Sequence, residues 1–94
     1  MLLLGAIGPA RSGGLAQLTP LVRECFATQS LRACERALIE AEALQQQAAD
    51  RDRYACQSMV LGLQADVVMM QLRAGRGSKA YETLAGVQQR CSGF

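Results

Sequence analysis

Apolar residues recur every three or four positions along most of the chain, with polar residues between them, from about residue 20 onward. This spacing places the apolar side chains on one face of an α-helix, because a helix has about 3.6 residues per turn. Ala, Leu and Gln, which favour helices, are abundant, and β-branched residues are few. The pattern predicts four helices, over residues 20–27, 31–48, 53–73 and 79–91. We therefore expect an all-α fold.

Residues that cap helices lie near the predicted ends of these segments. A side chain that accepts a hydrogen bond from the first free backbone N–H groups favours a helix start, and glycine favours a helix end. Proline is well tolerated at the first helical position. The predicted start signals are Thr19 before Pro20, Ser30, either Asp50 or Asp52, and Ser78, and the predicted end of the third helix is Gly75.

The second and fourth predicted helices each carry one apolar stripe that should face the core. In the second helix the stripe consists of Leu31, Cys34, Leu38, Ala41, Leu44 and Ala48. In the fourth helix it consists of Ala80, Tyr81, Leu84, Val87 and Cys91. The predicted connections are short, so successive helices should lie side by side and antiparallel. The expected architecture is a four-helix array of antiparallel helical hairpins.

The third predicted helix is apolar on almost every side. A helix with so little polar surface either sits among its neighbours or contacts a partner. Its expected inner stripe is Cys56, Met59, Val60, Leu63, Val67 and Met70. The candidate partner-binding residues are Leu61, Val68 and Leu72 on another side of this helix, together with Tyr81. We predict a small, non-enzymatic protein-interaction or accessory domain without a cofactor, whose partner is another protein or a second copy.

Four cysteines fall on the expected inner stripes: Cys25, Cys34, Cys56 and Cys91. The first two flank a short turn, and the last two lie at ends of helices that meet in an antiparallel hairpin. Of the three possible pairings, we favour Cys25–Cys34 with Cys56–Cys91. The alternative is four reduced thiols buried as small hydrophobic groups. Disulfides favour a secreted, periplasmic or luminal protein over a cytoplasmic one.

The N-terminal segment differs from the rest of the chain. Residues 1–10 are mostly apolar with small residues near the end, and residues 11–14 have the composition of a loop. We expect residues 1–14 to be a flexible tail or the remnant of a signal peptide, followed by a single helical domain over residues 15–94. No later segment predicts a membrane span, because polar side chains interrupt the most apolar window.

The residues present bear on four further kinds of chemistry. The chain has no His, and its net charge of +2 does not indicate nucleic-acid binding. Its cysteines lack the close spacing of zinc ligands, so no metal site is predicted. A thiol-dependent redox protein is the alternative function, with Cys34 or Cys56 as nucleophile, because each lies near a helix start beside an arginine. The turn at residues 75–79 is a candidate anion site through Arg76 and Lys79, with a solvated turn as the alternative.

The middle of the chain resembles a tetratricopeptide-type helical repeat. The residues that carry the resemblance are Leu61-Gly62 in one helix, and Gly77 and Ala80-Tyr81 at the start of the next. They match small and aromatic packing positions of that family over about 35 residues. The resemblance implies helical-hairpin packing and protein binding.

Overall fold

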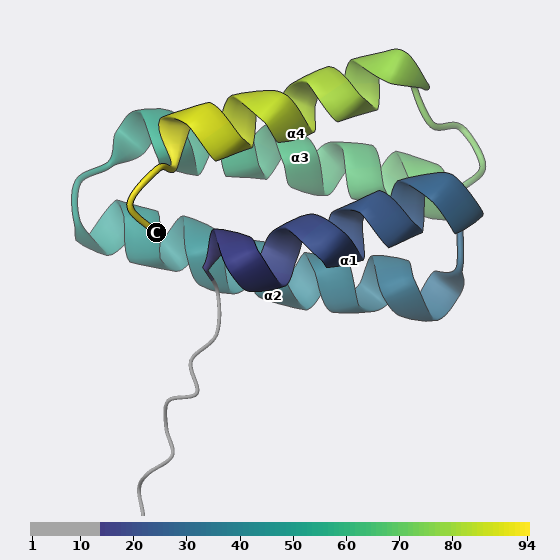
Figure 1. Ribbon diagram of the computed structural model, residues 1–94, viewed down its shortest axis with the longest axis horizontal. Coiled ribbons are helices and arrows are strands. Elements are labelled where there is room, and N and C mark those ends of the chain that lie inside the picture. Colours follow the sequence, from purple (N-terminus) through teal and green to yellow (C-terminus); the bar gives the residue numbers. More distant parts are fainter. Residues whose placement is uncertain (1–13) are drawn as a thin grey trace, which may run out of the picture.

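The computed structural model describes residues 14–94, and within that range the only regular secondary structure is helix. Its elements are α1 (Leu15–Thr28), α2 (Leu31–Asp50), α3 (Tyr54–Gln71) and α4 (Ser78–Arg90). The chain reverses direction at each connection, and α1 and α4 lie in front of the neighbouring helices α2 and α3 (Figure 1). The prediction of an all-α chain with four helices is confirmed.

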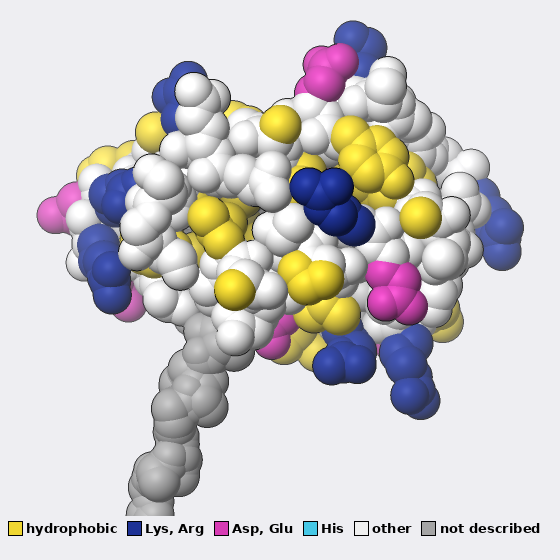
Figure 2. All heavy atoms as spheres, in the orientation of Figure 1, with side chains coloured by type: hydrophobic (Ala, Val, Ile, Leu, Met, Phe, Trp, Pro, Cys, Tyr) yellow, Lys and Arg dark blue, Asp and Glu magenta, His cyan; other side chains and the backbone are white. Residues whose placement is uncertain are grey.

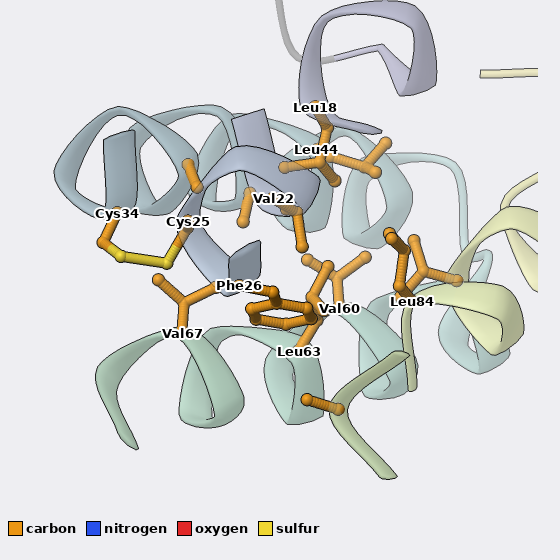
Figure 3. Close-up of a cluster of buried hydrophobic side chains, with 14 of the residues drawn as sticks. Leu18, Val22, Cys25, Phe26, Cys34, Leu44, Val60, Leu63, Val67 and Leu84 are labelled. Carbon is orange, nitrogen blue, oxygen red and sulfur yellow. A yellow bond between two sulfur atoms is a disulfide. The ribbon is translucent and has the colours of Figure 1, made fainter. Parts of the chain in front are cut away.

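The core lies between these two layers. The inward side of α2 is built from small residues, with Ala37 and Ala41 fully buried, which allows α1 and α3 to approach it closely. From α1, Phe26 lies among the buried side chains of α3 (Figure 3). Each fully buried Leu or Val contributes about 1.5–3 kcal/mol. The buried residues that α1 and α3 contribute to this core are Leu18, Val22, Phe26, Val60, Leu63 and Val67.

Both favoured disulfides are present, so the predicted pairing is confirmed. Cys25 and Cys34 have Cα atoms 4.7 Å apart, and Cys56 and Cys91 have Cα atoms 4.8 Å apart. All four side chains are fully buried. Each disulfide joins two consecutive helices, the first joining α1 to α2 and the second joining α3 to α4.

The first helix starts earlier than the sequence predicted. Gly14 is its N-cap, and the Gly14 carbonyl accepts hydrogen bonds from the backbone N–H groups of Gln17 and Leu18. Pro20 therefore lies inside α1, where it removes one backbone donor. The burial of Leu18 offsets this loss, because it ties the segment before the proline to the core. Residues 1–13, which carry most of the predicted tail or signal-peptide remnant, lie outside the described residues.

Three predicted helix ends are also wrong by a few residues. Asp52 does not start α3, since its φ is 57° and the N-cap is Arg53. Gly75 does not end α3, because Leu72 is the C-cap and Arg73 takes the left-handed conformation. Ser78 is the first residue of α4 rather than its cap. Ser30 caps α2 as predicted, and its hydroxyl accepts from the Ala33 N–H at 3.4 Å.

Two residues assigned to inner stripes face solvent instead. Leu31 is exposed because the buried stripe of α2 runs through Ala33, Cys34 and Ala37. Tyr81 is 41% exposed and packs edge-on against Phe26, with ring centroids 5.2 Å apart. In each case the neighbouring buried positions hold smaller residues, Ala33 and Cys34 beside Leu31 and Ala80 beside Tyr81.

Candidate protein-interaction face on α3

One side of α3 is exposed along its whole length. We call it the α3 face, and its residues are Tyr54, Ser58, Leu61, Ala65, Val68 and Leu72. They are separated by alternating steps of four and three, which aligns them in one stripe along the helix. Leu72 is 69% exposed, Leu61 49% and Val68 40%. The stripe is the outward counterpart of the buried stripe of the same helix.

The α3 face carries no charged side chain. Between Tyr54 and Leu72 the only charged residue is Asp66, and it is buried. By contrast, the exposed side of α2 carries Arg32, Glu35 and Arg36 within its first two turns. An exposed, uncharged helix face of this length is typical of a surface that contacts another molecule.

The border of the α3 face toward α2 is polar. The side-chain amide of Gln57 donates to Gln45 Oε1 at 3.0 Å, and that of Gln64 donates to Glu42 Oε1 at 3.1 Å. The hydrogen bond from Gln64, followed by those from two glutamines of α2, lowers the pKa of Glu42. This border keeps its hydrogen bonds within the chain.

The border toward α4 is held by an ion pair. Arg76 Nε lies 2.7 Å from Asp66 Oδ1, and Arg76 Nη2 lies 2.8 Å from Asp66 Oδ2, so the guanidinium binds both carboxylate oxygens. Arg76 Nη2 also donates to Thr83 Oγ1 at 3.1 Å. The hydrogen bond from Arg76 lowers the pKa of Asp66, and the same pairing raises the pKa of Arg76. Asp66 is therefore satisfied inside the protein and adds no charge to the face.

Opposite charges lie at the two ends of the α3 face. At the first end the hydroxyl of Tyr54 donates to Asp52 Oδ1 at 2.8 Å, and this bond raises the pKa of Tyr54. At the other end Arg73 directly follows Leu72 and donates to Gln29 Oε1 at 3.4 Å. The face thus has a carboxylate beside its first residue and a guanidinium beside its last.

The structure brings three of the four predicted partner-binding residues together. Leu61, Val68 and Leu72 share the α3 face, whereas Tyr81 lies on α4 against Phe26 of α1. Thr83, two residues after Tyr81, points toward the α3 border, and a two-residue step turns a helix by about 200°. Tyr81 therefore belongs to the other side of α4.

Sequence reasoning missed the remaining members of the face. Tyr54 lies seven residues before Leu61, and Ser58 lies seven residues before Ala65. A step of seven residues, which also separates Leu61 from Val68, is the signal that could have identified these residues. Ser58 and Ala65 have small side chains, which add little to an apolar pattern.

The side of the molecule opposite the α3 face has a different surface. Figure 2 shows the side that α1 and α4 form, with hydrophobic atoms in separate patches among Lys, Arg, Asp and Glu side chains.

The predicted anion-binding pair lies in the connection before α4 and at its first turn. Arg76 already binds the buried carboxylate of Asp66, so an external anion would compete with this ion pair. Lys79 is exposed in the first turn of α4. The positive φ of Gly77, 63°, sets the direction in which the chain enters that helix.

The candidate nucleophiles of the redox alternative are both in disulfides. Cys34 is bonded to Cys25 and Cys56 to Cys91, so neither is a thiol in this structure. Within residues 14–94, no group of three or more Cys, Asp or Glu side chains is arranged to hold a metal ion. In the same range no helix combines the length and the apolar character needed to cross a membrane.

Comparison of the chain with models of protein families, with curated proteins and with solved structures finds no match.

Proposed function

We propose that this chain is a non-enzymatic helical domain that binds another protein chain through the α3 face. The observation that carries the proposal is the exposed stripe from Tyr54 to Leu72, which has no charged side chain. Apolar area of this kind gains free energy when it leaves water, by about 25 cal/mol per Å². The hydrogen-bonded borders support the proposal, because polar groups that are already satisfied suit the rim of an interface.

Our proposal includes a resemblance to tetratricopeptide-type helical hairpins, and the packing of the four helices supports it. In such arrays, consecutive helical hairpins pack side by side and present one exposed surface to a partner. Here α2 and α3 pack against each other between the outer helices α1 and α4. The proposal places the partner on α3, one of these two central helices.

The two disulfides support an oxidising location in the same proposal, whether secreted, periplasmic or luminal. Such bonds persist outside the reducing environment of the cytosol. They also stabilise a domain whose core is small. With this added stability, the domain can fold while the α3 face stays exposed. A thiol-dependent redox function is the other candidate, and it requires one of these buried disulfides to open first.

The proposal is tested by capturing partners with the oxidised protein and with two variants of the α3 face. Val68→Asp places a charge within the face, and Leu72→Asp places one at its end. Both positions are exposed, so the fold should persist, which thermal unfolding followed by circular dichroism verifies. We expect each variant to lose the partner that the unchanged protein captures.

Ile39→Asp is the matched control for this experiment. Ile39 is 67% exposed and lies on α2, outside the α3 face. The control adds the same charge at a similarly exposed apolar position and should retain the partner. Retention of the partner by the folded Val68→Asp and Leu72→Asp variants would contradict the proposal.

A further inference from the structure

We propose that the partner of the α3 face is the α3 face of a second copy, bound antiparallel about a two-fold axis. This inference rests on the proposed function and names the partner. The first observation that supports it is the seven-residue repeat of the stripe. Tyr54, Leu61 and Val68 are seven residues apart, as are Ser58, Ala65 and Leu72. Two such series on one helix form the seam of a two-helix coiled coil.

The side chains of the stripe complement one another when the second copy is antiparallel. A two-fold axis that crosses the α3 face midway between Tyr54 and Leu72 places Leu61 opposite Ala65 of the copy and Val68 opposite Ser58. Each large apolar side chain near the centre then meets a small one. Large side chains opposite small ones let two helices approach closely, and interaxial distance depends on the residues at the contact.

The ends of the face support the same orientation. The register that pairs Leu61 with Ala65 brings Tyr54 next to Leu72 of the copy. It sets Arg73 opposite Arg53 of the copy and one residue from Asp52. A parallel arrangement would instead place Asp52 against Asp52 and Arg73 against Arg73. Opposite charges at the two ends of a face thus favour the antiparallel dimer.

Two arginines near the start of α3, Arg51 and Arg53, contact the C-terminal end of the chain and not the α3 face. Arg53 Nη2 donates to the backbone carbonyls of Arg90 and Ser92 at 2.9 and 3.1 Å. The guanidinium groups of Arg51 and Arg53 each lie 5.0 Å from the centre of the Phe94 ring. Asp52, whose carboxylate accepts from Tyr54, is therefore the charge that borders the face at this end.

The dimer contact extends over a length that suits a stable pair of helices. From Tyr54 to Leu72 the stripe spans 18 steps, or about 27 Å at 1.5 Å per residue. The borders with α2 and α4 run along both sides of this stripe, so the second copy would cover the face and rest on polar rims. Two-fold contacts of one surface with itself are the commonest form of association in soluble oligomers.

Sedimentation equilibrium of the full, oxidised chain tests this inference, with a charge-pair exchange to fix the orientation. The chain has a mass of 10.1 kDa, and we expect reversible association to twice that mass. Ser58→Lys and Val68→Glu, each alone, should weaken association by at least about tenfold. The double variant should restore association, because the antiparallel register places Lys of one copy opposite Glu of the other. Positions 58 and 68 are about 15 Å apart along one helix, too far to pair within a chain.

Each result decides a separate point. A double variant that stays dissociated contradicts the antiparallel register, because a parallel dimer would bring Lys against Lys and Glu against Glu. Ile39→Glu on α2 is the control and should associate as the unchanged chain does. A monomer at every concentration up to about 1 mM would overturn self-association. That result leaves the capture experiment with Val68→Asp and Leu72→Asp to decide separately whether the face binds a different protein.

Discussion

The two halves of the molecule are joined by one disulfide each, but at opposite ends of their helices. In the first half, Cys25–Cys34 spans the short turn between α1 and α2. In the second half, Cys56–Cys91 joins the start of α3 to the residue after α4, far from the connection between them. At that connection the ion pair of Asp66 and Arg76 holds the helices together instead.

The different positions of the two disulfides match the different lengths of the α1–α2 and α3–α4 connections. The first has two residues, one in the left-handed conformation and one that caps α2, so the turn is already tightly defined. The second has six residues, and α4 begins without a side-chain cap. A disulfide that closes a long loop removes more freedom from the unfolded chain than one that closes a short loop. The second half therefore depends more on its disulfide, and this difference can be measured.

Replacing both Cys56 and Cys91 by Ala should have the largest effect. The sequence separation is 35 residues, and the loop-entropy treatment assigns about 3.8 kcal/mol to such a loop. We expect the free energy of unfolding to fall by about that amount. Chemical denaturation measured by circular dichroism checks it. An effect smaller than that of the first disulfide would contradict the comparison.

Replacing both Cys25 and Cys34 by Ala should cost less. Their separation is nine residues, which corresponds to about 2.7 kcal/mol in the same treatment. Both pairs are fully buried, so packing losses should be similar and the order of the two effects should reflect loop length. Denaturation of the two double variants under identical conditions gives the comparison directly.

Arg76→Ala should destabilise the connection between α3 and α4 by about 2 kcal/mol, because it leaves a buried carboxylate without its partner. Lys79→Ala, in the first turn of α4, is the control and should change stability by less than about 0.5 kcal/mol.

The effect of Arg76→Ala should also depend on pH. The pKa of Asp66 is lowered in the folded protein by its hydrogen bond to Arg76, so the folded state binds the proton less readily than the unfolded state. The stabilisation is present above the unfolded pKa of about 3.9 and is lost as the pH falls through the lower folded pKa. The difference in stability between the unchanged protein and Arg76→Ala should therefore shrink on acidification. A constant difference from neutral to acid pH would contradict the role assigned to this pair.

The smallest expected effect is the difference in stability between alanine variants of Ser30 and Ser78, the two serines near helix starts. Ser30→Ala should cost about 1 kcal/mol, because the hydroxyl accepts from a free N–H group at the start of α2. Ser78→Ala should cost less than about 0.5 kcal/mol, since Gly77 occupies the cap position of α4. Thermal unfolding of the two variants compares them, and equal shifts would contradict the assignment of the caps.

Much of the candidate site was predictable, since local spacing controls it. The step of seven residues that aligns Leu61 with Val68 is visible in the chain itself. The partner of Asp66 was not predictable, because ten residues and a turn separate it from Arg76. The position of Tyr81 was missed for a related reason, since a stripe of apolar residues does not show which of them the neighbouring helix α1 will cover.

The sequence by itself determined the helical class and the buried stripes in outline, and it favoured the pairing of the cysteines that the structure has. These properties depend on spacing along one helix and on the short connections between helices, which are local quantities. The tertiary structure alone decided that α1 runs through Pro20, that Asp66 is buried with Arg76, and that the α3 face is left uncovered. These outcomes depend on which helices pack together, because packing supplies the free energy that overrides a local breaker and selects the side of α3 that remains in water.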